Sequence, residues 1–134
     1  MASSPVTDEL EIQRVLAQYC HRCDDGDFDA LLALFAADEE LVYGDRVCRG
    51  REELLRFFQE MQGPAQRGKH LTLNSVIDIA GERASALSDF LFLRFVDGAL
   101  TPVFTGRYSD LFVRLENRWR IVRREIIRMD AAVA

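Results

Sequence analysis

Long apolar runs, cysteine and histidine are all scarce in this 134-residue chain, and each scarcity excludes a class of protein. No apolar run approaches the roughly 18 residues of a membrane span, and no charged-then-apolar leader opens the chain, so neither a membrane span nor a secretory signal is predicted. The cysteine count is three, which is odd and low. This count argues against a disulfide framework and fits a reducing compartment, so we expect a cytoplasmic protein.

The charge balance excludes nucleic acid as a standing partner. The formal net charge is −5, whereas phosphate binding needs a basic face. One local exception is a group of arginines near the C-terminus that alternates with Trp119, Ile121 and Ile127. We interpret this group as a solvated sheet face; its members are Arg118, Arg120, Arg123, Arg124 and Arg128.

Cys20, His21 and Cys23 lie close enough in the chain to suggest a metal site. Cys20 and Cys23 also fit the apolar stripe of a helix, and no second pair of ligands follows elsewhere. The sequence therefore predicts no metal centre, and it contains no cofactor motif.

Three helices are expected in the first half of the chain. Thr7 is suited to cap a first helix, whose apolar stripe runs from Ile12 to Cys23 before Asp24-Asp25-Gly26 ends it, with Gly26 suited to a left-handed cap. Asp27 can cap a short second helix whose inward residues are Phe28, Leu31, Leu32 and Phe35. A short hairpin around Gly44-Asp45 and a third helix from Gly50 to about Met61 follow.

From His70 onward the apolar period changes from helical to two. Four strands are predicted, over His70–Ala80, Arg83–Val96, Thr101–Arg114 and Arg118–Met129. Short connections such as Asp97-Gly98 favour an antiparallel meander. Helices followed by strands predict an α+β fold, a cone-shaped α+β barrel with three N-terminal helices on a curved antiparallel (mixed) sheet and an open mouth for a small molecule. We expect a single domain over residues 1–134, with a flexible arm at 1–6 and a flexible tail at 130–134.

Of the two histidines, His70 is the better candidate for a base that works near neutral pH. His21 lies mid-helix and is expected to face solvent or an interface. His70 opens the first long strand, and Thr72 and Asn74 share its face in an unusually polar row. The opposite face carries Leu71, Leu73, Ile77 and Ile79. A solvated outer face is the alternative interpretation of this polar row.

Five segments in this order carry a family likeness: Tyr19–Phe35, Gly50–Leu54, His70–Asn74, Gly106–Asp110 and Trp119–Val122. Together they span the chain from about Leu10 to Arg128 and resemble SnoaL-like proteins of the nuclear transport factor two-like superfamily. That superfamily includes scytalone dehydratase, dehydrochlorinase, ketosteroid isomerase and polyketide cyclases. The resemblance implies the same α+β fold, but fold alone does not determine the reaction.

The resemblance also implies a catalytic Asp–His dyad. The aspartate of the dehydratase and dehydrochlorinase branch falls on Asp24, and its histidine falls on His70. The dehydratase's tyrosine after the second helix falls on Tyr43, and Tyr19 stands where ketosteroid isomerase has its oxyanion tyrosine. The dehydratase's second pocket histidine is absent, because its place falls near Ser88.

Aromatic residues at alternating positions are candidates for the wall of a pocket. The residues expected to contact a substrate are Tyr19, Phe58, Asn74, Phe90, Phe92 and Tyr108. Core packing is the alternative role for each aromatic, and termination of the first helix is the alternative role for Asp24.

These residues predict a cofactor-independent lyase or isomerase, dehydratase- or cyclase-like, acting on a small, largely apolar carbonyl or polyketide-like compound. His70 is the base, Asp24 orients it, and Tyr43 polarises a carbonyl or holds a water. The alternative is a non-catalytic ligand-binding or assembly domain, similar to the small subunits of ring-hydroxylating dioxygenases. The resemblance also implies a homodimer or higher homo-oligomer through the outer sheet face.

Overall fold

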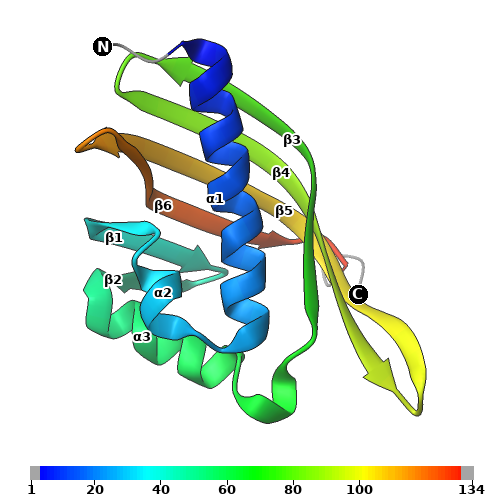
Figure 1. Ribbon diagram of the computed structural model, residues 1–134. Coiled ribbons are helices and arrows are strands. Elements are labelled where there is room, and N and C mark those ends of the chain that lie inside the picture. Colours follow the sequence, from blue (N-terminus) through cyan, green and yellow to red (C-terminus); the bar gives the residue numbers. More distant parts are fainter. Residues whose placement is uncertain (1–3, 131–134) are drawn as a thin grey trace.

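The computed structural model describes residues 4–130, in which helices cover one face of a curved six-stranded sheet, so the predicted α+β fold is confirmed (Figure 1). The helices are α1 (Pro5–Asp25), α2 (Phe28–Leu32), α3 (Gly50–Met61) and the short 3-10 helix η1 (Pro64–Gln66). The strands are β1 (Phe35–Tyr43), β2 (Arg46–Arg49), β3 (Lys69–Ala80), β4 (Arg83–Val96), β5 (Ala99–Leu115) and β6 (Arg118–Arg128). Within the described residues, no helix combines the length and the apolar character needed to cross a membrane.

The strands follow the order β2-β1-β6-β5-β4-β3 across the sheet. Strands β3 to β6 form the predicted antiparallel meander, and β1 joins β6 in parallel, so the sheet is mixed. Its edges, β2 and β3, are not paired with each other, and the sheet therefore curves around α1 without closing into a complete barrel (Figure 1). The long hairpin of β4 and β5 extends beyond the helices at one end of the sheet.

Helix α1 begins earlier than the sequence analysis proposed. Ser4, not Thr7, is the N-cap, and its hydroxyl oxygen accepts a hydrogen bond from the Thr7 backbone N–H at 3.1 Å. Pro5 and Val6 therefore belong to the helix and not to a flexible arm. Proline fits the first helical turn because the N–H groups there have no acceptor within the helix, and proline has no N–H. Gly26 adopts the predicted left-handed C-cap, and Asp27 caps α2 as expected.

Residues 1–3 of the predicted flexible arm and residues 131–134 of the predicted flexible tail lie outside the described residues. Asp130, which the sequence analysis assigned to the tail, is ion-paired with Arg128 at 2.7 Å. The second helix is also shorter than predicted: it ends at Leu32, and Phe35 opens β1 opposite Ile121.

A bulge in β3 changes which side chains face the helices. The pairing register shifts between Leu73 and Val76, where Asn74 adopts a left-handed φ of +55°. His70 and Thr72 face inward before the bulge, whereas Ser75, Ile77 and Ile79 do so after it. The predicted inward position of Asn74 and the outward positions of Ile77 and Ile79 were therefore wrong. One inserted residue moves every later side chain to the opposite face, and asparagine tolerates the left-handed backbone that this requires.

A second register shift, in β6, buries an arginine. Leu111 pairs with Arg123 but Phe112 pairs with Ile121, so Val122 is the extra residue. Trp119 and Ile121 face the core before this point, and Arg124 does so after it. The solvated interpretation of the arginine group was therefore wrong for Arg124, whose exposed fraction is 0%.

Arg124 is held by a bidentate ion pair with Asp110, at 2.7 and 2.8 Å, and both side chains are completely buried. Its guanidinium carbon lies 4.1 Å from the ring centroid of Tyr19 and 3.9 Å from that of Tyr108. Burial alone lowers the pKa of Arg124, but the charge and hydrogen bonds of Asp110 outweigh burial and raise it, so the guanidinium stays charged. The pair therefore links β5, β6 and α1 inside the core.

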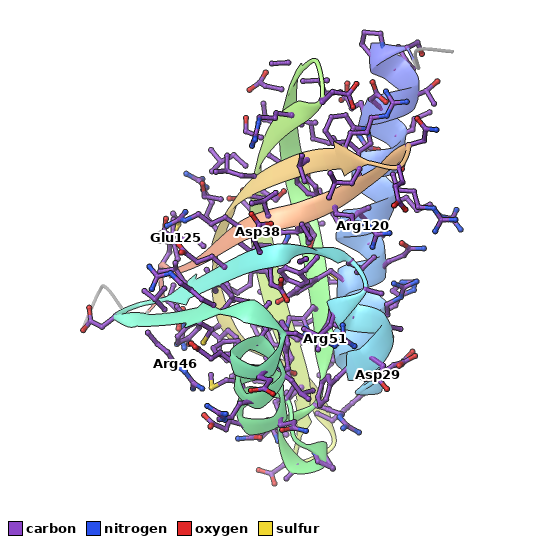
Figure 2. All side chains as sticks on the ribbon, turned by 90° about the vertical axis from the view of Figure 1, so that its left-hand side faces the viewer. Asp29, Asp38, Arg46, Arg51, Arg120 and Glu125 are labelled. Atoms are coloured by element: carbon purple, nitrogen blue, oxygen red, sulfur yellow. The ribbon has the colours of Figure 1, made fainter. Side chains whose placement is uncertain are left out.

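Surface ion pairs connect the smaller helices to their neighbours (Figure 2). Arg51 of α3 approaches Asp29 of α2 at 3.7 Å, and Arg46 of β2 bonds Glu60 of α3 at 2.7 Å. Exposed pairs of this kind contribute little stability, so the apolar contacts of α3 determine its position. The buried residues of α3 are Leu54, Phe57 and Phe58.

We expect Asp110→Asn to destabilise the fold by about 3–5 kcal/mol, because it leaves the buried Arg124 guanidinium without a countercharge. Urea unfolding monitored by circular dichroism measures this loss. The matched control is Asp89→Asn, which breaks the half-exposed pair with Arg107 on the outer face and should change stability little. Equal, small losses in both variants would contradict a central role for the buried pair.

Candidate active site

The end of α1 and the start of β3 bring Asp24 and His70 together. Gly26 closes the helix by donating its N–H to the carbonyls of Arg22 and Cys23, which leaves Asp24 in the last turn, close to β3. The Asp24 carboxylate accepts from the His70 backbone N–H at 3.0 and 3.2 Å. Its Oδ1 also lies 2.6 Å from Nδ1 of the His70 ring. Side chain and main chain of His70 are thus held by one carboxylate.

The contact with Asp24 determines which nitrogen of His70 is free. The two side chains are only 9% and 6% exposed, respectively. An ionised carboxylate can only accept, so Nδ1 carries the proton of this short contact and the lone pair of the neutral ring is on Nε2. Nε2 has no hydrogen bond to any residue in the range 4–130. The ring packs against Phe92, with centroids 4.5 Å apart.

His70 lines a small internal cavity of about 40 Å³ between the helices and the sheet. Five of the predicted site residues share the cavity wall with it: Tyr19, Tyr43, Phe58, Phe90 and Tyr108. Burial raises the pKa of Tyr19 and of Tyr108, so both phenols remain protonated at neutral pH. The cavity is therefore lined mostly by aromatic rings with a few hydroxyl groups.

Two residues predicted to contact substrate lie elsewhere. Asn74 is exposed on the outer sheet face, where its amide donates to Asp89 at 3.0 Å, because the β3 bulge turns it away from His70. Phe92 lies beneath the His70 ring and stacks on Phe104 at 4.9 Å, outside the cavity lining. Phe92 supports the base and does not line the cavity.

Tyr43 is oriented by an arginine that the sequence analysis placed in solvent. Arg128 donates to the Tyr43 hydroxyl oxygen at 3.1 Å and lies over the Phe104 ring at 4.3 Å. Hydrogen bonds from Arg128 lower the pKa of Asp130 to about 2, so this ion pair persists at neutral pH. Because the Tyr43 oxygen accepts from Arg128, the phenolic proton of Tyr43 is left to donate to another group.

Further residues line the cavity that were not predicted to contact a substrate. They are Cys23, Phe57, Met61, Gln62, Phe104 and Ile126. A signal for Gln62 was present, because it follows Phe58 by four residues and Leu54 by eight and so shares their helix face. Ile126 and Arg128 had no such signal, since the bulge at Val122 determines their face.

The cysteines of α1 are buried thiols. Burial raises the pKa of Cys20 and of Cys23, so both are neutral and poorly nucleophilic near pH 7. Cys20 Sγ lies 3.1 Å from the Thr72 hydroxyl oxygen. In the stretch from Ser4 to Asp130, no group of three histidine, cysteine or acidic side chains is arranged to hold a metal ion.

A second hollow lies on the other side of His70. It is an open groove of about 440 Å³ between α1 and β3, and its lining includes Gln13, Cys20, His21 and Thr72. His70 contributes to both the groove and the internal cavity. His21 is exposed, as its mid-helix position predicted, and it lies on this groove.

Comparison with known proteins places the chain in a family. The SnoaL-like domain matches residues 4–125. The chain is 28% identical over 130 residues to Rv2910c, an uncharacterized protein of Mycobacterium tuberculosis, and the match covers 92% of this chain and 87% of that protein.

Two solved structures, both from Novosphingobium aromaticivorans, share the fold. An NTF2-like protein with a cystatin-like fold is 25% identical, with a TM-score of 0.84, over 93% of this chain and 84% of that one. A protein provisionally assigned as a scytalone dehydratase is 22% identical, with a TM-score of 0.82, over 92% of this chain and 85% of that one. The chain therefore belongs to the SnoaL-like domain family and has the nuclear transport factor two-like fold.

Proposed function

We propose that this protein is a cofactor-independent lyase or isomerase that removes a proton from a small, largely apolar carbonyl compound. His70 is the base, Asp24 orients it, and Tyr43 donates a hydrogen bond to the carbonyl oxygen. The observation that carries the proposal is the 2.6 Å contact between Asp24 and Nδ1 of a histidine whose ring lines an apolar cavity. A base positioned in this way typically contributes about 10²–10⁴-fold in rate.

The proposed reaction starts when Nε2 of His70 takes a proton from the carbon next to the carbonyl. The C–H electron pair moves into an enolate, whose oxygen accepts the hydrogen bond from Tyr43. The Asp24 carboxylate stabilises the imidazolium that forms. Return of the proton to a different carbon completes an isomerisation, whereas delivery to a departing hydroxyl group releases water and completes a dehydration.

The cavity size limits the substrate. A cavity of about 40 Å³ is far below the roughly 300–1,000 Å³ of common ligand pockets, so a substrate must displace wall side chains to enter. Met61 is the wall residue best suited to move, because it is half-buried and its unbranched chain has several rotatable bonds. The substrate class that fits is a small or polyketide-like compound that displaces the Met61 side chain to reach His70.

His70→Gln should lower proton abstraction by at least about 10²-fold, because glutamine has no basic nitrogen. The measurement is deuterium incorporation next to the carbonyl of cyclohexanone in D₂O, followed by NMR. The melting temperature should change little, since the glutamine amide can also donate to Asp24.

The matched control is His21→Gln, the same substitution at the chain's other histidine, which is exposed. It should exchange cyclohexanone as fast as the wild type. The base assignment is wrong if the wild type exchanges no faster than buffer, or if His70→Gln keeps the wild-type rate.

Tyr43→Phe should lower the same exchange rate by about 10²–10³-fold, the usual effect of losing one donor to a developing oxyanion. The substitution keeps the ring that packs against Phe57 at 5.8 Å, so folding should be preserved. A variant with unchanged exchange would assign Tyr43 to packing alone.

A non-catalytic assembly role is the second candidate, and the small cavity favours it. A separate feature is the group of apolar residues exposed on the outer sheet face. The apolar residues exposed on this face are Leu71, Leu73, Val76, Leu87 and Leu111. Val76 and Leu87 are direct cross-strand partners, so their side chains form a continuous surface. We propose that this face pairs with a second copy of the chain under either function.

Leu87→Lys should convert the dimer to a monomer, because a charge in the middle of an apolar interface has to be desolvated. Analytical ultracentrifugation measures the mass. Leu10→Lys is the control, since Leu10 is equally apolar and 60% exposed but lies on α1, in the other layer. A monomeric wild type would overturn the proposed pairing.

A further inference from the structure

Gln62 is a buried polar residue with an unpaired atom in the wall of the same cavity as His70. It is 8% exposed, and its Oε1 is inaccessible and has no hydrogen-bond partner within the described chain. Buried polar atoms are almost always paired, so an orphan acceptor calls for a specific explanation. In an apolar cavity, the absent partner is most simply part of a ligand.

The backbone at Gln62 is held in place from both sides. As the C-cap of α3, its N–H donates to the Phe58 carbonyl at 2.8 Å. Its own carbonyl accepts from Nε of Arg67 at 3.1 Å. The two backbone contacts therefore fix the point from which the Gln62 side chain extends, and the side chain itself is buried in the cavity wall.

Two neighbouring polar residues of the cavity, His70 and Tyr43, have partners within the protein. Asp24 binds Nδ1 of His70, and Arg128 binds the oxygen of Tyr43. Gln62 differs from both, because its Oε1 accepts no hydrogen bond from the rest of the described protein.

We propose that Gln62 is a specificity residue that binds a hydroxyl group of the substrate. This inference rests on the proposed function and narrows its substrate class to a hydroxy-carbonyl compound, whose carbonyl is bound by Tyr43 and whose hydroxyl is bound by Gln62. A hydroxyl group donates to the amide oxygen and accepts from the amide nitrogen, so it suits either orientation of the amide.

The test measures binding and not turnover, so it is independent of the His70 mechanism. Phenol and toluene are the probes, because they have nearly the same size and differ by one hydroxyl group. NMR titration of the ¹⁵N-labelled protein gives the dissociation constant of each. Gln62→Met, which keeps the side-chain volume, should weaken phenol binding by about tenfold, the usual worth of one hydrogen bond, and leave toluene binding unchanged or tighter.

The control is Gln59→Met, the same substitution one turn earlier on the exposed side of α3, which should change neither constant. Thermal unfolding provides a second readout. Because an unpaired buried acceptor disfavours folding, Gln62→Met should melt at or above the wild-type temperature.

Three results would overturn the proposal: no saturable phenol binding by the wild type, equal changes in phenol and toluene affinity, or a clearly lower melting temperature for Gln62→Met. The last result would mean that the amide stabilises the fold. If the binding experiment fails, deuterium exchange by His70 can still be observed. If the exchange experiment fails, the difference between phenol and toluene binding can still be observed. The two proposals can therefore be overturned separately.

Discussion

The buried ion pair between Asp110 and Arg124 is the constraint on which the rest of the interior depends. A completely buried guanidinium is tolerated only with a paired charge, and here both oxygens of Asp110 supply it. The rings of Tyr19 and Tyr108 both pack next to the guanidinium group. These same tyrosines line the cavity, and Phe90 stacks on Tyr108 at 4.4 Å. This ion pair therefore positions two tyrosines of the cavity wall, Tyr19 from α1 and Tyr108 from β5.

Polar groups near the site fall into two kinds. Some are satisfied internally: Asp110 by Arg124, and Ser88 by Ser75 at 2.8 Å. The others, His70, Tyr43 and Gln62, line the cavity and have hydrogen-bonding capacity that no described residue uses. The cavity residues that can act on a ligand are thus distinct from the Asp110–Arg124 and Ser75–Ser88 pairs.

Much of the candidate site could be predicted from the sequence. The helix-ending acidic turn and the change of period at His70 placed the dyad at two junctions that the fold brings together. The family likeness supplied the pairing, since neither residue alone distinguishes a catalytic role from a structural one. Side chains that follow a bulge were assigned to the wrong face, because a single inserted residue is invisible in an alternating pattern until the strand partners are known. The error affected Asn74, Ile77 and Ile79 in β3 and Arg124 in β6.

The sequence by itself determined the α+β class, the four-stranded meander and the positions of Asp24 and His70 at element ends, because these depend on local periodicity and on turn residues. Only the tertiary structure decided which polar side chains face inward. The inward position of Arg124 depends on its strand register, on the countercharge from β5 and on the rings from α1 and β5. Whether Gln62 Oε1 finds a hydrogen-bond donor likewise depends on the groups that surround it in the folded chain, and no local sequence pattern indicates these groups. Burial of a charge or an amide is a property of the assembled core, and so it could be known only from the folded chain.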